Sequence, residues 1–437
     1  IAMPAARPAT IRELVSALDS YKVPITTLPN LNDLVGRGVT VRDVRSLSIE
    51  DLLSRDPVGL DLTAVRGLIG GKRVLVTGAA GSIGSELCKQ ICRVDPAELL
   101  LFERSETDLY TLHNRLTELG FEHLVRPIVG DVTDEERLDE VFGRFTPDIV
   151  FHAAAYKHVP LMEHNACEAV KNNVGGTRKL VEASARHGVG RFILVSTDKA
   201  VKPTSVMGAT KRVAEQVVLA ASGGATRFAA VRFGNVLGSS GSVVPRFLEQ
   251  IRAGGPVTVT HPDVRRYFML IPEAVGLLLQ AAAMEDESPM YVLDMGEQIP
   301  VLDLARNLIR LSGFLPEREI AITFTGLRPG EKLVEDLVGP DEVASASPVE
   351  KVLAVRAAEM PKSVEFTERL AALEWLAAHG DAQGAVRQLQ EMEPQFAPGR
   401  TWTAAVTAPE PAGRPDLEPP ESTGSLSSGS RPGGVAP

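Results

Sequence analysis

The sequence has little of what marks secreted, membrane-spanning or nucleic-acid-binding proteins. It has three cysteines, at positions 88, 92 and 167, which are too few for a disulfide framework and lack the spacing of metal ligands, so no metal site is predicted. It has no apolar run of about 18 residues, so no membrane-spanning helix is predicted. Its net charge of −10 argues against binding nucleic acid, although a local basic pocket for a small anion remains compatible with it. These absences favour a globular protein of a reducing compartment, by default the cytoplasm.

Composition divides the chain into five predicted parts. Residues 1–70 are expected to form a partial domain or linker arm with one short amphipathic helix. Residues 71–235 alternate apolar runs with helical patterns, and residues 236–345 have the looser rhythm of a smaller lobe whose chain crosses back to the first part. A helical extension is predicted over 346–394, and the Pro-, Gly- and Ser-rich residues 395–437 are predicted to be disordered.

The apolar runs of the central part predict its fold class. Segments such as "RVLVTG", "ELLLFE" and "DIVFHAA" are continuous in Val, Ile, Leu and Phe, which is typical of strands buried on both faces. Strands that alternate with helices form parallel, doubly wound sheets. The predicted fold is therefore α/β, a Rossmann-type doubly wound parallel sheet with a smaller mixed substrate-binding lobe.

A glycine-rich turn, "TGAAGSIGSE", follows the first predicted strand. Gly78, Gly81 and Gly84 lie between that strand and a predicted helix, where glycines let the helix N-terminus approach a pyrophosphate. Glu103 ends the second strand, where a carboxylate can accept hydrogen bonds from the adenosine ribose and would repel a 2′-phosphate. This favours NAD over NADP, although the neighbouring Arg104 could accommodate the phosphate.

The segment "STDKAVKPTSVMGATKR" follows the fifth predicted strand. Thr197, Asp198 and Lys199 lie at the carboxyl end of the strand, which is the usual place of chemistry in such sheets. Lys211 follows on the next helix, one turn beyond Met207. The segment resembles the catalytic segment of nicotinamide-dependent sugar enzymes, which normally carry a Tyr four residues before the Lys, where this sequence has Met207. The resemblance implies either an inactive relative or a changed proton pathway.

Five segments in order carry a resemblance to a known family. "GAAGSIGSELC", "HAAAYKHVPLMEHN", "STDKAVKPTSVMGATKR", "RFGNVLGSSGSVVP" and "GLRPGEKLVEDL" resemble the large bacterial nucleotide-sugar 4,6-dehydratases of polysaccharide and glycan biosynthesis, in the extended short-chain dehydrogenase/reductase superfamily. The likeness runs from about residue 10 to residue 345. Members with Met at the Tyr position are known, so the resemblance favours an active enzyme.

The resemblance implies a cofactor, a substrate and a location. It implies a tightly bound NAD that is regenerated in each turnover, a UDP-sugar substrate, with UDP-N-acetylglucosamine expected, and a homo-oligomer. Full-length members usually carry N-terminal membrane helices. We therefore expect this chain to be the catalytic part, on the cytoplasmic side, of a longer protein anchored in the inner membrane.

The resemblance also implies roles for the catalytic segment. Asp198 is the expected acid for the C6 hydroxyl and Lys199 the expected base at C5, while Thr197 is the nearest substitute for the missing Tyr at the O4 proton. This chemistry needs a raised pKa at Asp198 and a lowered pKa at Lys199, which requires burial to outweigh their mutual attraction. Lys211 is expected to hold the nicotinamide ribose, and Met207 to pack against the nicotinamide or the sugar.

Two further sets of residues follow from the motifs and the resemblance. The expected cofactor-binding residues are Gly78, Gly81, Ser82, Ile83, Gly84, Glu103, Arg104, Ser105, Asp131, Val132, Ala153, Ala154, Ala155, Asn173 and Lys211. The expected substrate-binding residues are Lys157, Asn235, Val243, Arg266, Arg328 and Glu331.

Two other functions are compatible with parts of the pattern. A nucleotide-sugar C4 epimerase would share the cofactor and the substrate, but it normally needs the Tyr and lacks the adjacent Asp and Lys. A catalytically silent NAD-binding regulator would explain Met207, but not the presence of Thr197, Asp198, Lys199 and Lys211 together. The resemblance favours retention of configuration at C5 over inversion.

Overall fold

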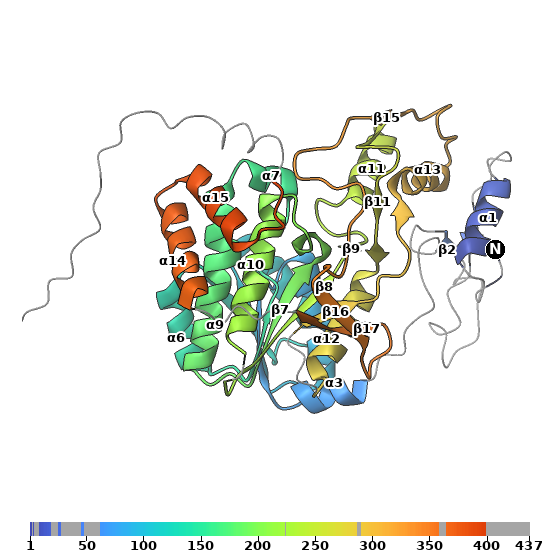
Figure 1. The fold of residues 1–437 in the computed structure, drawn as a ribbon. Helices are drawn as coiled ribbons and strands as arrows, with labels where there is room; N and C mark the ends of the chain where they lie inside the picture. The colour runs from blue at the N-terminus through green and yellow to red at the C-terminus, as the bar shows by residue number, and fades with distance from the viewer. Residues whose placement is uncertain are drawn as a thin grey trace, which may run out of the picture. The chain divides into compact units, whose positions relative to one another are not determined.

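The structure is a computed structural model. It describes residues 1, 3, 8–18, 25–27, 45–47, 62–222, 224–285, 290–357 and 364–398. The predicted disordered tail beyond residue 398 lies outside the described residues. Figure 1 shows the arrangement of the elements.

One sheet of nine strands forms the centre of the described chain. Its strands are β3 (Arg73–Thr77), β4 (Glu98–Glu103), β5 (Val125–Val129), β6 (Ile149–His152), β7 (Arg191–Thr197), β8 (Arg227–Phe233), β13 (Met290–Leu293), β16 (Glu342–Ala346) and β17 (Val352–Ala357). Their order is β16–β17–β13–β8–β7–β6–β3–β4–β5. The seven strands from β13 to β5 are parallel, and β17 and β16 continue the sheet antiparallel. The predicted doubly wound fold is confirmed.

Helices cover both faces of the sheet. One face packs against α3 (Leu62–Ile69), α4 (Ser82–Ile91), α5 (Glu106–Glu118) and α12 (Ile271–Ala283). The other packs against α6 (Glu135–Phe145), α8 (Ala166–Ala169), η5 (Val170–Gly175), α9 (Gly176–Arg186) and α10 (Val206–Ala220). A helical pair, α14 (Val364–Ala378) and α15 (Ala382–Met392), stacks on this second layer (Figure 1).

Two parts of the chain differ from the expected boundaries. Helix α3 falls within the predicted N-terminal arm but packs against α12 and contributes Val65 and Ile69 to the core beside the sheet. The predicted helical extension instead contains strand β17, which pairs with β13 and β16 and buries Val352 and Val355. The other described elements of the arm are α1 (Pro8–Leu18) and the antiparallel pair β1 (Thr26–Thr27) and β2 (Arg45–Ser46).

A smaller lobe stands beyond the carboxyl ends of the parallel strands (Figure 1). It holds α11 (Val243–Arg252) and α13 (Val301–Leu311) over the parallel pair β10 (Val257–Val259) and β15 (Ile322–Phe324). Short pairs of β9 (Asn235–Val236) with β12 (Phe268–Met269), and of β11 (Arg265–Arg266) with β14 (Ile299–Pro300), join the lobe to the sheet. Its core has its own apolar cluster, which includes Phe247 and Leu304.

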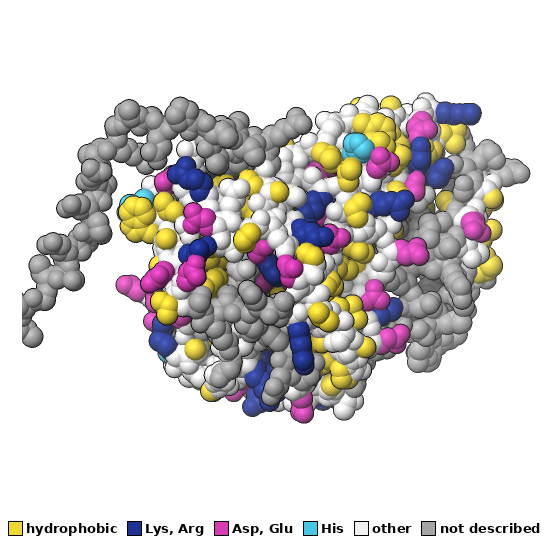
Figure 2. All heavy atoms as spheres, viewed as in Figure 1, with side chains coloured by type: hydrophobic (Ala, Val, Ile, Leu, Met, Phe, Trp, Pro, Cys, Tyr) yellow, Lys and Arg dark blue, Asp and Glu magenta, His cyan; other side chains and the backbone are white. Residues whose placement is uncertain are grey.

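The described surface is mixed in charge. On the face in Figure 2, Lys and Arg side chains alternate with Asp and Glu rather than gathering into one basic stripe. Among the helices of the described ranges, none combines the length and the apolar character that crossing a bilayer requires.

Candidate active site

A cavity of about 1140 Å³ opens at the carboxyl ends of the parallel strands, between the sheet and the lobe. Of the residues expected from the sequence, its wall contains Gly78, Gly81, Ser82, Ile83, Gly84, Glu103, Arg104, Asp131, Val132, Ala153, Ala154, Ala155, Lys157, Thr197, Lys199, Met207, Lys211, Asn235, Val243, Arg266, Arg328 and Glu331. Three expected residues, Ser105, Asn173 and Asp198, lie behind this wall. The chain thus brings nearly the whole expected set around one space.

The glycine-rich turn between β3 and α4 requires the absence of side chains. Gly78 has a φ of +64°, and a Cβ there would lie 2.6 Å from the backbone nitrogen of Ala154. A Cβ on Gly84 would overlap the carbonyl oxygen of Gly78. The turn therefore brings the N-terminus of α4 against the cavity, and a helix N-terminus is a favourable place for a pyrophosphate.

Glu103 lies at the end of β4 and is held by the backbone. Its Oε1 accepts from the N–H groups of Arg104 at 2.8 Å and Ser105 at 3.1 Å, and its Oε2 accepts from Ala80 at 3.2 Å. A carboxylate offers about four lone-pair positions, so acceptor capacity remains for ribose hydroxyls. Together with the glycine turn and the small residues Ala153 to Ala155, this geometry fits a dinucleotide whose ribose is unphosphorylated.

The side chain of Arg104 contacts Tyr156 and Asp131. Its guanidinium donates to the Tyr156 hydroxyl at 2.6 Å, lies 5.0 Å from the centre of that ring, and pairs with Asp131 at 3.7 Å. Because Arg104 already makes these contacts, its guanidinium is less available to bind a 2′-phosphate on the cofactor.

Ser105 and Asn173 support the wall from behind. The Ser105 hydroxyl accepts from the N–H of Asp108 and caps α5. Asn173, in η5, accepts from the backbone N–H of Tyr156 at 2.8 Å and donates to the Tyr156 carbonyl and to the Thr210 hydroxyl. Both therefore position the cofactor half of the cavity without lining it.

The catalytic segment forms a tight hydrogen-bonded group at the end of β7, in the turn η6 (Asp198–Ala200). The Thr197 hydroxyl donates to Asp198 Oδ1 at 2.9 Å, and Lys199 Nζ donates to the same oxygen at 2.9 Å and to Asn235 Oδ1 at 3.1 Å. Asp198 is fully buried, whereas Thr197 and Lys199 face the cavity. Asp198 is thus linked to the cavity by the hydrogen bonds that it accepts from Thr197 and Lys199.

The pKa of Lys199 corrects one expectation. Burial lowers the pKa of this ammonium and so does Arg266, but the carboxylates of Asp198 and Glu335 raise it, and the result is a pKa above the ordinary value. The expectation that burial would dominate is wrong for the described structure, because two carboxylates face the amine. Sequence reasoning missed Glu335, which is 3% exposed and lies 3.7 Å from Lys199 Nζ.

Lys211 and Met207 lie side by side on α10. Lys211 Nζ donates to the Val195 carbonyl at 2.8 Å, and burial lowers its pKa to about 8. Met207 is 2% exposed and packs into the apolar core while touching the cavity. The side chain at the Tyr position therefore acts as packing.

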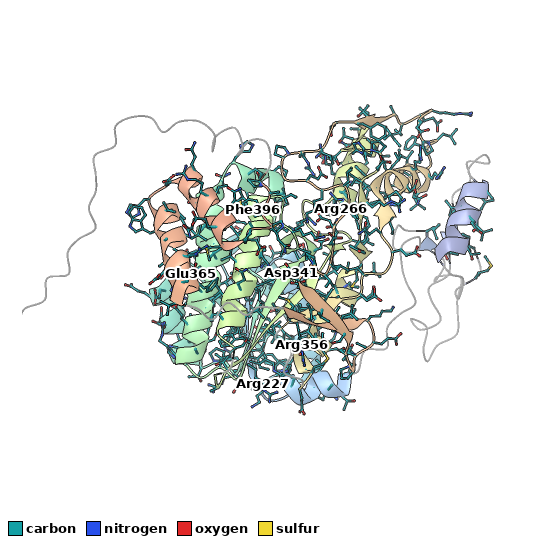
Figure 3. The ribbon with its side chains drawn as sticks, in the orientation of Figure 1. Arg227, Arg266, Asp341, Arg356, Glu365 and Phe396 are labelled. Atoms are coloured by element: carbon teal, nitrogen blue, oxygen red, sulfur yellow. The ribbon has the colours of Figure 1, made fainter. Side chains whose placement is uncertain are left out.

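The lobe supplies the cationic end of the cavity. Arg266 lies on β11 (Figure 3) and donates to the carbonyls of Lys332 and Leu333 and to Glu331. Arg328 donates to the other oxygen of Glu331 at 3.3 Å. Lys157, on the sheet side, has a pKa lowered by burial.

The loop between β9 and α11 was not expected at the cofactor turn. Its Ser240 N–H donates to Ser82 Oγ at 3.1 Å. Gly241 has a φ of +69°, and a Cβ there would lie 2.5 Å from the His158 ring. The small residues of "LGSSGS" were the available signal for this close approach.

The family model described as polysaccharide biosynthesis protein matches residues 74–357. The capsular polysaccharide biosynthesis protein CapD of Staphylococcus aureus is 45% identical over 80% of this chain and 59% of its own length. The chain thus spans less than two thirds of that relative.

Two relatives have more specific names. The inverting UDP-N-acetylglucosamine 4,6-dehydratase of Campylobacter jejuni is 31% identical, over 63% of this chain and 80% of its own. The UDP-glucose 4-epimerase of Rickettsia rickettsii is 33% identical over the same shares. The chain is therefore related to nucleotide-sugar dehydratases and epimerases.

Solved structures share the fold. Pen of Bacillus thuringiensis superposes with a TM-score of 0.61 at 31% identity, covering 67% of this chain and 90% of its own. The UDP-glucuronic acid 4-epimerase of Bacillus cereus, solved in complex with UDP-glucuronic acid and NAD, superposes with a TM-score of 0.53 at 23% identity, over 61% of this chain and 90% of its own.

Proposed function

The chain belongs to the polysaccharide biosynthesis protein family, and from that premise we propose that it is a UDP-N-acetylhexosamine 4,6-dehydratase. Its expected substrate is UDP-N-acetylglucosamine and its product the UDP-4-keto-6-deoxy sugar. The main support for this proposal is the hydrogen-bonded group of Thr197, Asp198 and Lys199. It lies at the same cavity as the glycine-rich turn and Glu103, where a dinucleotide would bind. Such a group serves an elimination, which an epimerase does not perform.

The cofactor half of the cavity is proposed to hold NAD. The turn at Gly78 to Gly84 would receive the pyrophosphate, Glu103 the adenosine ribose, and Lys211 the nicotinamide ribose. When bound, NAD would accept the hydride from C4 of the sugar and return it at C6, which regenerates it in each turnover. NAD in the related Bacillus cereus structure supports this cofactor class.

Thr197 and Asp198 are proposed to carry the O4 proton. The Thr197 hydroxyl would take the proton of the C4 hydroxyl while passing its own to Asp198, along the 2.9 Å hydrogen bond. The proton would arrive at Asp198 Oδ1, the oxygen that accepts from Thr197 and Lys199, while Oδ2 accepts no hydrogen bond from any described residue. Asp198 would then return its proton to Thr197 while Thr197 protonates the departing C6 hydroxyl, so that the proton taken from O4 and the C6 hydroxyl together make up the water that is lost.

Lys199 is proposed as the base at C5. In its neutral form it would remove the C5 proton, which the C4 ketone acidifies, as the C6 hydroxyl leaves. Returning that proton to the same face of C5 while hydride arrives at C6 completes the product. One base on one face favours retention of configuration, and the sum of the steps is the loss of one water.

The lobe is proposed to hold the nucleotide part of the substrate. Arg266 and Arg328 would bind the diphosphate, since guanidinium groups match phosphate oxygens in pairs. Glu331, which lies between them, would accept from the uridine ribose hydroxyls. Lys157, Asn235 and Val243 line the part of the cavity between this end and Lys199.

Incubation with UDP-N-acetylglucosamine, followed by NMR of the products, tests this function. A 4-keto-6-deoxy sugar supports the dehydratase. The isomer with an axial C4 hydroxyl would identify an epimerase, a function that the similarity to the Rickettsia enzyme keeps as the alternative. An unchanged substrate in the presence of bound NAD would identify a catalytically silent NAD-binding protein.

A further inference from the structure

Glu335 is a buried acid on the cavity wall that the reaction above does not use. Its side chain is 3% exposed, with one oxygen 3.7 Å from Lys199 Nζ and the other 3.4 Å from Lys332 Nζ. Burying a carboxylate costs free energy that close cations must offset. Glu335 is stabilised in its buried position by Lys332 and by Lys199, the proposed base.

The segment that carries Glu335 is fastened to the catalytic turn. Lys332 Nζ donates to the Val201 carbonyl at 2.6 Å, two residues beyond Lys199. The carbonyl of Glu335 accepts from Gln298 at 2.6 Å. Residues 326–335 also include Arg328 and Glu331 on the same cavity wall. One short segment thus contacts both the expected nucleotide end and the expected base.

We propose that Glu335 is a positioning residue: together with Asp198 and Asn235 it fixes the Lys199 amine at the reacting end of the cavity and ties it to the segment that grips the nucleotide. This inference rests on the proposed dehydratase function. Lys199 would then be held from three separate parts of the chain, by hydrogen bonds to the catalytic turn and to β9 and by an ion pair with the segment 326–335.

The charges around Lys199 set the direction of the expected effect. Asp198 and Glu335 favour its ammonium form and Arg266 opposes it, while Lys332 partly offsets the charge of Glu335. Removing the charge of Glu335 therefore lowers the pKa of Lys199. Because the base must be neutral to accept the C5 proton, the acidic limb of the pH profile moves to lower pH.

The test is the pH profile of kcat/KM for dehydration by the NAD-loaded protein. We expect Glu335→Gln to move the acidic limb down by about one pH unit, since an opposite charge at this distance shifts a pKa by roughly one to three units. Glu335→Asp, which keeps the charge but withdraws it, should move the limb in the same direction by less. Asp336→Asn is the matched control, because Asp336 is the next residue, is half exposed and pairs with Lys202 at the surface. Its limb should stay at the wild-type pH.

Each outcome decides the proposal. The proposal is overturned if the acidic limb of the pH profile does not move in Glu335→Gln, or if it moves equally in Asp336→Asn. It is also overturned if Glu335→Gln folds but is inactive at every pH. If Glu335→Gln does not fold, the direction of the Glu335→Asp shift decides in its place. A wild-type protein that makes no 4-keto-6-deoxy sugar overturns the proposed function and this inference with it, whereas an active wild type with unmoved limbs overturns the inference alone.

Discussion

The two halves of the cavity are built by opposite means. On the cofactor side the wall is backbone and small residues, and its defining positions, Gly78 and Gly84, are places where a Cβ does not fit. On the catalytic side the wall consists of buried charges, with Lys199 held among Asp198, Asn235 and Glu335. The first half depends on close approach of backbone to backbone, and the second on charged side chains that meet at one amine. Substitutions should therefore damage the two halves in separable ways.

The largest expected effect is the loss of turnover, without loss of bound NAD, when Lys199 or Asp198 is replaced. Lys199→Met and Asp198→Asn should each lower the rate of 4-keto-6-deoxy product formation by about 10²–10⁴, which is the contribution of a positioned acid or base. The amount of NAD carried by the purified protein should remain at the wild-type level, because neither side chain belongs to the cofactor wall. Product NMR and NAD release on denaturation measure the two quantities. Loss of NAD in either variant would contradict the separation.

The contrast between the two halves of the cavity also explains which parts of the fold and of the site could be predicted from the sequence. The glycine turn, Glu103 and the parallel, doubly wound sheet follow from contiguous motifs and periodicity, and the turn and Glu103 lie in the cavity wall. Asp198 and Lys199 are neighbours in sequence, so their contact was also foreseeable. The direction of the Lys199 pKa was not foreseeable, because Glu335 adds to the effect of Asp198 and is brought to Lys199 from a distant part of the chain by tertiary folding. Strand β17 was missed for a similar reason, since its place between β13 and β16 exists only once the sheet is assembled.

On the cofactor side, Gly84→Ala should lower the affinity for NAD by about 10- to 100-fold. The new methyl overlaps the Gly78 carbonyl, so the turn must open, and overpacking of this kind costs about 1–3 kcal/mol. Calorimetric titration of the protein with NAD measures the loss. Gly67→Ala, in α3, is the control, because a Cβ there meets nothing within 4 Å and NAD affinity should not change. Equal losses in both variants would refute the role of the turn.

Met207 lies at the junction of the two halves. Met207→Ala should keep turnover within about tenfold of the wild type, because the thioether carries no proton, while the free energy of unfolding falls by about 2 kcal/mol through the cavity left in the core. Product NMR and denaturant unfolding check the two effects. A loss of turnover as deep as that of Lys199→Met would instead give Met207 a part in the chemistry.

Arg104 should show the smallest effect, and it tests whether the cofactor half selects NAD by Glu103 alone. Arg104 is half exposed and already engages Tyr156 and Asp131, and contacts of this kind contribute about 0.5–1 kcal/mol. Arg104→Ala should therefore weaken NAD binding by less than about fivefold, and NADP should bind poorly both before and after the change. Fluorescence titration of the protein with each nucleotide measures the two affinities. If the wild type bound NADP as well as NAD, and Arg104→Ala abolished that binding, Arg104 would be the residue that meets the adenosine ribose substituent, and the carboxylate of Glu103 would not decide the cofactor.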